Sequence, residues 1–298
     1  MAFKSIYPEK TEIKDFHENM LGMVAPRPIA FASTLSENGI ANLAPYSFYN
    51  AFSSNPPILV FSSNRRVSDN TTKDTLANVS NMREVVINAV SYHIVRQMAL
   101  ASVDFPAEVS EFDKTGLTPL KSEKVKPWRV AESPAQMECV VKDIIPLGQG
   151  GGAGHLVICE IVVMHVREDV LDGEGKIDPH KIDLMGRMGR AFYVRASGAA
   201  IHKIYQPFHI IGIGVDRLPQ VVRRSHILTG NDLAHLGALP HWPADAEIAN
   251  AMEMPEVVDI LTRASTDVLA AREEFHKLAK SLIAAERAHL ALAVLLIS

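Results

Sequence analysis

Cysteine is nearly absent from this sequence, because the 298 residues include only two, Cys139 and Cys159. Both lie in strand-like segments without the spacing of metal ligands, so we expect reduced thiols in the core rather than a disulfide. The twelve histidines are scattered, with no His-x-His or His-x-x-x-His pair backed by carboxylates on a helix. The sequence therefore predicts no metal site.

Long apolar runs and an excess of positive charge are also missing. No run reaches the roughly 18 apolar residues of a membrane span, and the N-terminal residues lack the apolar core of a signal peptide. The net charge of -4 argues against a nucleic-acid-binding surface. With 47% apolar and 21% charged residues, the composition is that of a soluble globular protein of one large or two modest domains. We expect a cytoplasmic protein that binds neither membranes nor nucleic acid.

An early stretch combines a hairpin with a polar segment. Ile29 to Thr34 and Ile40 to Pro45 are predicted strands, joined by a turn with Asn38-Gly39 at its corner. The next residues are rich in hydroxyl and amide groups and end at Pro56-Pro57, before the apolar strand Ile58 to Phe61. Such a segment suits either a rigid shelf that hydrogen-bonds a planar polar ligand or a wide surface turn.

A helix is predicted from Lys73 to about Met82, with apolar residues at steps of three. Its start offers unpaired amides, the cation of Lys73 and neighbouring threonine hydroxyls, a combination that suits a phosphate group. The alternative is ordinary capping of the helix by a threonine or by Asp74.

Strands dominate from about residue 27 to 166, a pattern that favours a closed antiparallel barrel over a parallel α/β sheet. The last two strands, Gln136 to Pro146 and His155 to Val166, are joined by a segment with five glycines. Because a strand and not a helix follows these glycines, they match no nucleotide-binding motif and predict a flexible hairpin tip. Further on, Arg187 and Arg190 precede two aromatic residues and suit either an anion or a solvated turn.

The C-terminal hundred residues have a different character. A loop region is expected first, and from Pro255 onward the chain contains no further glycine or proline, which predicts a long helical region. Apolar residues from Val257 to Leu282 recur at alternating steps of four and three, the pattern of a seam that packs against another helix. A cap at Ser265 or Thr266 would divide this region into two helices. The partner helix belongs either to the same chain or to a second subunit.

Short motifs follow one another along the first two thirds of the chain. They are Ala25-Pro-Arg-Pro-Ile29, Ser33-Thr34, Asn42 to Asn50, Ser54 to Pro57, Lys73-Asp-Thr75, Glu111-Phe112, Glu132-Ser-Pro134 and Met185 to Gly189. In this order the motifs resemble the flavin reductase-like family with the FMN-binding split-barrel fold. The resemblance covers roughly residues 10 to 196.

The resemblance implies a mainly β fold, a six-stranded antiparallel Greek-key split barrel with flanking helices, over residues 1–200. Residues 201–298 form a mostly helical extension, with a long helix or helix pair, that short family members lack. The resemblance also implies a homodimer that holds FMN noncovalently near the subunit interface. Hydride would pass from NADH or NADPH to FMN, and then to a partner monooxygenase or another electron acceptor. No catalytic acid or base is expected, because the isoalloxazine carries out the chemistry.

By position, the resemblance assigns residues of this chain to the FMN. Contacts to the isoalloxazine, the ribityl chain or the phosphate are expected from Ser33, Thr34, Ser47, Asn50 and Ala51. Contacts to the phosphate and ribityl end are expected from Arg27, Ser62, Ser63, Lys73, Asp74 and Thr75, with Arg187 as a further candidate near the flavin.

Two other functions remain open for this sequence. One is an FMN-binding electron carrier or sensor without NAD(P)H activity, in which the C-terminal extension covers the flavin face where the nicotinamide would stack. The other is a non-catalytic, partner-binding protein that keeps the barrel while its loops no longer hold flavin.

Overall fold

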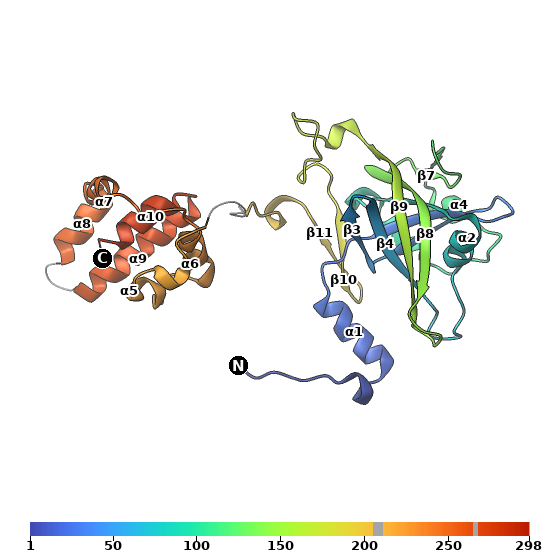
Figure 1. Cartoon of the computed structure of the whole chain (residues 1–298), viewed down its shortest axis with the longest axis horizontal. Coiled ribbons are helices and arrows are strands. Elements are labelled where there is room, and N and C mark those ends of the chain that lie inside the picture. Colours follow the sequence, from blue (N-terminus) through green and yellow to red (C-terminus); the bar gives the residue numbers. More distant parts are fainter. Residues whose placement is uncertain (205–210, 265–267, 298) are drawn as a thin grey trace. The chain divides into compact units, whose positions relative to one another are not determined.

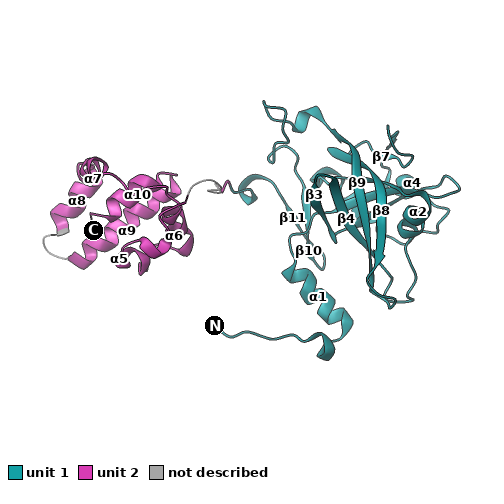
Figure 2. Ribbon diagram, viewed as in Figure 1, with its two compact units in different colours: residues 1–202 teal, residues 203–298 magenta. Residues whose placement is uncertain are grey.

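The computed structural model describes residues 1–204, 211–264 and 268–297. The chain forms two compact units, Met1–His202 and Lys203–Ser298 (Figures 1 and 2). The first unit is built on a β-sheet, and the elements of the second are helices.

A seven-stranded antiparallel sheet forms the first unit, in the order β2-β1-β5-β8-β9-β4-β3. Among the described residues no ladder joins the two edge strands, β2 and β3, so the sheet is a barrel left open on one side. The predicted mainly β split-barrel fold is confirmed, but the expected closure of the barrel and the predicted number of six strands are wrong. The strands are β1 (Ala30–Leu35), β2 (Ala41–Tyr46), β3 (Tyr49–Ser54), β4 (Pro57–Asn64), β5 (Glu84–Asn88), β8 (Ala135–Pro146) and β9 (Gly154–Val166).

The additional strand is β3, which occupies the segment predicted as a polar loop. It pairs with β4, with Asn50 opposite Val60 and Ala51 opposite Leu59. Every residue of β3 after Tyr49 is exposed. Because an edge strand with two solvated faces needs no alternation of apolar and polar side chains, the sequence carried no strand signal here.

The predicted hairpin is confirmed as β1 and β2, which pair in antiparallel register. Gly39 in its turn has a φ of 81°, a left-handed conformation that favours glycine. Side chains alternate across β1, so that Ala30 and Ala32 face the barrel core while Phe31 faces a second apolar cluster. Both faces of this strand are therefore buried.

Four helices accompany the sheet: α1 (Ile13–Met23), α2 (Asp74–Met82), α3 (Val95–Leu100) and α4 (Glu111–Thr115). The predicted helix near residue 73 is confirmed as α2. Glu111 holds α4 to the sheet, because its carboxylate accepts a hydrogen bond of 2.8 Å from the Leu43 amide. Two short antiparallel pairs complete the unit, β6 (Pro119–Leu120) with β7 (Arg129–Val130) and β10 (Met185–Gly189) with β11 (Phe192–Arg195).

The two cysteines are free and buried in the barrel core, as predicted. Burial raises the pKa of the Cys139 thiol to about 12, which keeps it protonated and unreactive at neutral pH. Membrane spans were searched in the described part of the chain, and no helix there has the length and apolar character to cross a bilayer.

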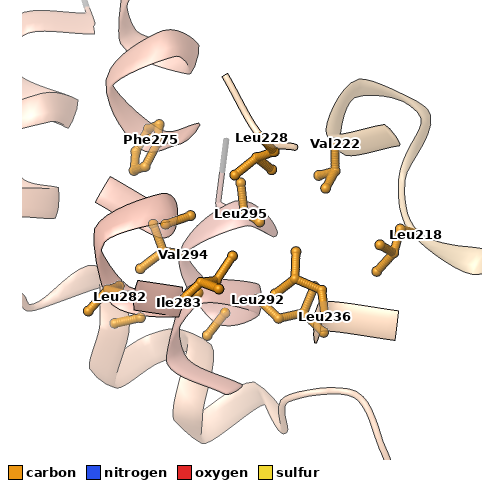
Figure 3. Packing of buried hydrophobic residues seen from close by; sticks show 14 of the residues in the cluster. Leu218, Val222, Leu228, Leu236, Phe275, Leu282, Ile283, Leu292, Val294 and Leu295 are labelled. Atoms are coloured by element: carbon orange, nitrogen blue, oxygen red, sulfur yellow. The ribbon is translucent and has the colours of Figure 1, made fainter. Parts of the chain in front are cut away.

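The second unit is helical and has its own core (Figure 3). The closing apolar run Leu290 to Ile297 mostly belongs to α10 and lies within this core, where Leu292 and Val294 are fully buried. The helices are α5 (Gln220–Arg223), α6 (Gly230–Gly237), α7 (Asp245–Met252), α8 (Pro255–Ala264), α9 (Val268–Ala284) and α10 (Ala288–Leu295).

Two expectations for this unit need correction. The predicted loop region contains α6, whose start is fixed by a capping box between Thr229 and Asp232. The predicted seam is interrupted, because Leu261 and Val268 are 40% and 67% exposed. The helices α8 and α9 pack against each other within the unit. Ser265 and Thr266, the predicted cap, lie outside the described residues.

Candidate functional site

A cleft of about 500 Å³ opens on the first unit beside the start of α2. One wall comes from α1 and another from the turn between β2 and β3, while the end of β4 and the glycine-rich β8–β9 tip complete it. The side chains of Ser47, Ser62 and Lys73, all predicted FMN contacts, line it together. The remaining lining residues are Ile13, Lys14, His17, Pro45, Tyr46, Phe48, Asn64, Arg65, Val67, Gly151 and Gly152.

The N-terminus of α2 supplies positive charge to this cleft. Lys73 is the N-cap residue, and no side chain caps the helix, so neither a threonine nor Asp74 fills the capping role that was the alternative reading. The Lys73 ammonium lies 5.6 Å from the centre of the Tyr46 ring, and it forms no ion pair with any residue that the structure describes. Open helix amides beside an unpaired cation are the elements of an anion site.

A smaller pocket adjoins Lys73, and Asp74 and Thr75 line it with Arg66 and Glu111. Burial raises the pKa of Glu111, although the Leu43 amide opposes that effect. Arg66 is held by Asp104, with 3.0 Å between guanidinium and carboxylate. The predicted group Lys73-Asp74-Thr75 thus stays together at the start of α2, with Lys73 shared by both hollows.

Thr34 and Thr75 belong to a buried hydrogen-bond network rather than to the cleft surface. The Asn42 amide donates to the Thr34 hydroxyl at 3.1 Å and to the Thr75 hydroxyl at 2.9 Å. Asn78 in α2 donates to the same Thr34 hydroxyl at 3.0 Å. This network fixes the first turn of α2 against β1 and β2. Thr34 therefore holds the start of the helix in position and does not face the cleft.

We expect Asn42→Ala to weaken FMN binding severalfold, because the first turn of α2 would lose its tie to the sheet. The protein should also lose about 1–3 kcal/mol of stability, since buried hydroxyls would lose a partner. Fluorescence titration with FMN and urea unfolding measure the two effects. Asn81→Ala, at an exposed position of the same helix, is the matched control and should change neither quantity. Unchanged FMN affinity in Asn42→Ala would contradict the positioning role.

Two buried polar atoms in the first unit, Arg27 Nη2 and Ser33 Oγ, have no hydrogen-bond partner among the described residues, and both residues were predicted to contact FMN. Tyr46 differs from them: burial raises the pKa of its hydroxyl to about 12, and Thr75 and Ser63 lie beside that hydroxyl as hydrogen-bond partners. Because unpaired buried polar groups are costly, a polar ligand group beside Arg27 Nη2 and Ser33 Oγ would be stabilising there, and the oxygens and ring nitrogens of FMN have the chemistry to supply it.

Arg27 is buried between α1 and β10. Its guanidinium donates to the carbonyl groups of Leu21 and Val24 at the end of α1 and lies 3.4 Å from Ser47 Oγ. Burial, followed by the charge of Arg187, lowers the pKa of Arg27. The Arg187 backbone pairs with that of Arg27, and its guanidinium stacks on Tyr193 at 4.6 Å. The structure therefore brings Arg27, Arg187 and Ser47 together.

Asn50 and Ala51 lie apart from these residues on the exposed edge strand β3, and they do not line the cleft. The Asn50 side chain accepts a hydrogen bond of 2.8 Å from the Ala51 amide. Within the first unit of one chain, these two predicted contacts are thus not assembled with the others.

The glycine-rich tip is packed against the cleft wall. The Gly152 amide donates to the Arg65 carbonyl at 3.1 Å, and Asn64 donates to the Gly152 carbonyl at 3.3 Å. A Cβ atom added at Gly154 would lie 2.5 Å from Ser62 Oγ. The predicted hairpin tip is confirmed, and its glycines permit this close approach.

We expect Gly154→Ala to weaken FMN binding severalfold, because the new methyl group would turn the Ser62 hydroxyl away from its present position. The melting temperature should change little, since a serine side chain can rotate. The matched control is Gly150→Ala, where an added Cβ meets nothing within 4 Å. Equal FMN affinities of the two variants would show that Ser62 makes no contact that matters.

Sequence reasoning missed part of the cleft. Lys14 and His17 come from α1, a stretch without a firm periodic signal, and the His17 ring lies edge-on to Phe48 at 6.1 Å. Tyr46 and Asn42 were within a quoted motif, but only the structure shows that one borders the cleft and the other joins two predicted residues.

Comparison with known proteins identifies relatives of the chain. The flavin reductase like domain matches residues 23–181. An uncharacterised protein of Aquifex aeolicus is 36% identical over 196 residues, which is 66% of this chain and 97% of that protein. The solved structure of nitrilotriacetate monooxygenase component B from Bacillus cereus is 29% identical in sequence to this chain and superimposes with a TM-score of 0.63. The match covers 69% of this chain and 99% of that one. The structure of 2-nitrobenzoate 2-nitroreductase from Pseudomonas fluorescens is 27% identical, with a TM-score of 0.62, and the match covers 71% of this chain and 100% of that one. The chain belongs to the flavin reductase-like family.

Proposed function

We propose that this protein is an FMN-binding oxidoreductase that passes hydride from NADH or NADPH to FMN and on to an acceptor. The observation that carries the proposal is the Lys73 ammonium, which forms no ion pair among the described residues and lies at a helix start without a side-chain cap, on the rim of a cleft of about 500 Å³. A dinucleotide or flavin phosphate is the group that such a site recognises best.

Within this proposal the residues bind and orient rather than react. Lys73 and the α2 amides would hold the FMN phosphate, while Ser47 and Ser62 would donate to the ribityl chain or the ring. The network from Asn42 keeps the helix start in place. When bound, the flavin supplies the hydride chemistry, so the chain needs no acid or base of its own.

We also propose a homodimer. Asn50 and Ala51 were expected to contact FMN but lie on the exposed β3 edge, where Phe52 is 68% exposed. A second subunit packed on β3 would cover this apolar side chain and bring the two residues toward a flavin. The cytoplasmic location expected from the sequence stays a prediction.

The electron acceptor is proposed from the relatives. One of them is named as component B of nitrilotriacetate monooxygenase and another as 2-nitrobenzoate 2-nitroreductase. We propose a partner monooxygenase as the acceptor of this chain, with a nitroaromatic compound as the second candidate.

The experiment is an absorption spectrum of the purified chain supplied with FMN, followed by anaerobic NADH and then NADPH in the same cuvette. Flavin bands that bleach with a nucleotide are expected, and the nucleotide that bleaches them identifies the donor. Bands that persist until dithionite is added would favour the carrier or sensor instead. A chain that takes up no FMN would overturn the proposal and leave a partner-binding role.

A further inference from the structure

A further hollow of about 530 Å³ lies within the helical unit, and none of its lining residues is assigned to FMN. It is lined by His235 of α6, Glu247 of α7 and His289 of α10, together with Asn250 and Arg287. Two of these lining residues, Glu247 and His289, lie next to each other, and His289 also contacts His241 from the segment before α7.

The two imidazoles face each other through their ring nitrogens. His289 Nε2 lies 3.3 Å from His241 Nδ1, and the ring centres are 5.0 Å apart with an interplanar angle of 80°. Two nitrogens that bind one Zn²⁺ at about 2.0–2.1 Å and at the tetrahedral angle are about 3.3–3.4 Å apart. The measured separation therefore leaves the two nitrogens at the spacing of ligands that share one ion.

Glu247 fixes the orientation of one of these rings. Its Oε1 atom lies 3.2 Å from His289 Nδ1, and its Oε2 atom accepts a hydrogen bond of 2.7 Å from the Ala244 amide. A carboxylate beside Nδ1 favours a proton on that nitrogen, which leaves the Nε2 lone pair available to bind an ion. This is the arrangement by which a carboxylate orients a metal-binding histidine.

We propose that His241 and His289 bind a divalent transition-metal ion of the Zn²⁺ or Cu²⁺ class through Nδ1 and Nε2. Imidazole nitrogen is a preferred ligand of these ions. The Trp242 carbonyl oxygen accepts a hydrogen bond of 3.3 Å from His241 Nδ1, so metal binding would move the proton of this ring to Nε2 and free the Nδ1 lone pair. In the part of the chain that the structure describes, no three side chains of His, Cys, Asp or Glu form a metal cluster, so water completes the coordination and the site stays open to the hollow.

The test uses the full chain, freed of metal with a chelator and titrated with Zn²⁺ in a calorimeter. We expect one equivalent to bind in the wild type. His241→Gln and His289→Gln should each weaken binding at least tenfold, and Glu247→Gln about tenfold to a hundredfold. His226→Gln, at an exposed position of the same unit, is the matched control and should leave Zn²⁺ affinity unchanged.

Electron paramagnetic resonance of Cu²⁺ bound to the wild type gives a readout that needs no variant, and His241→Gln adds a comparison. Hyperfine splitting from two imidazole nitrogens is expected in the wild type, and from one in His241→Gln. If the two rings share only a hydrogen bond, the wild type and a variant that combines His241→Gln with His289→Gln will bind Zn²⁺ alike. The two-nitrogen splitting will also be absent, and this result overturns the proposal.

Discussion

Replacing Glu138 with alanine is expected to destabilise the barrel by roughly 3–5 kcal/mol. This carboxylate is fully buried in β8. It accepts hydrogen bonds from the amides of Glu123 at 2.8 Å and Lys124 at 2.6 Å, and a third from the Val125 amide at 3.2 Å. The alanine variant would leave these amides unpaired and release the segment that precedes β7.

Urea unfolding followed by tryptophan fluorescence measures this loss. The chain has two tryptophans, and Trp128 lies next to the segment that Glu138 holds, so a Trp242→Phe background isolates its signal. Glu160→Ala is the matched control, because Glu160 on β9 forms only a partly exposed pair with Lys142, which contributes about 0–1 kcal/mol. Equal unfolding midpoints of the two variants would refute the role given to Glu138.

The contribution of Glu138 should also depend on pH. Burial alone would raise its pKa, but the amides of Glu123 and Lys124, together with His165, lower the pKa below its ordinary value. A lowered pKa in the folded state means that the stabilisation is present above the ordinary value of 4.5 and is lost as pH falls through the folded pKa. The stability difference between wild type and Glu138→Gln should therefore shrink below about pH 4.5. A constant difference would show that the charge is not what stabilises the segment.

Replacing Lys73 with alanine is expected to weaken FMN binding by about 1–3 kcal/mol through loss of a charge-assisted contact. The effect should be large because Lys73 forms no ion pair with the described residues and reaches both hollows at the start of α2. The lost binding energy should come from the contact with the FMN phosphate. Riboflavin lacks that group and should therefore bind the wild type and Lys73→Ala equally well.

Fluorescence titration with FMN and with riboflavin tests this prediction. Lys114→Ala, at an exposed position of α4, is the matched control for the loss of one positive charge, and Lys73→Arg should restore part of the affinity. An FMN affinity that stays at the wild-type level in Lys73→Ala would remove this lysine from the phosphate site.

Local signals explain which parts of the fold the sequence could predict. The hairpin of β1 and β2 was predictable because two adjacent residues, Asn38-Gly39, specify its turn. The helix α2 was predictable because its apolar residues recur at steps of three within one short segment. The strand β3 escaped prediction because its stability comes from pairing with β4, while its side chains lie in solvent. The helix α6 escaped because its capping box lies among glycines and a proline-rich neighbourhood, which are typical of loops.

The same distinction applies to the candidate site. Position in a motif identified Lys73, Ser47 and Ser62, which the structure gathers at one cleft. It could not separate residues that face a ligand from those that hold the fold, such as Thr34 in its buried network. Nor could it bring together His241 and His289, which are 48 positions apart and meet only through helix packing.

The attachment of α1 has a practical consequence for work with this protein. This helix has no buried residue of its own, and its end is held by the Arg27 guanidinium at the Leu21 and Val24 carbonyl groups. Its other face borders the cleft through Lys14 and His17. A purification tag fused before Met1 would therefore be able to displace α1 and its cleft-lining side chains. Ligand affinities should be compared only after the tag has been cleaved.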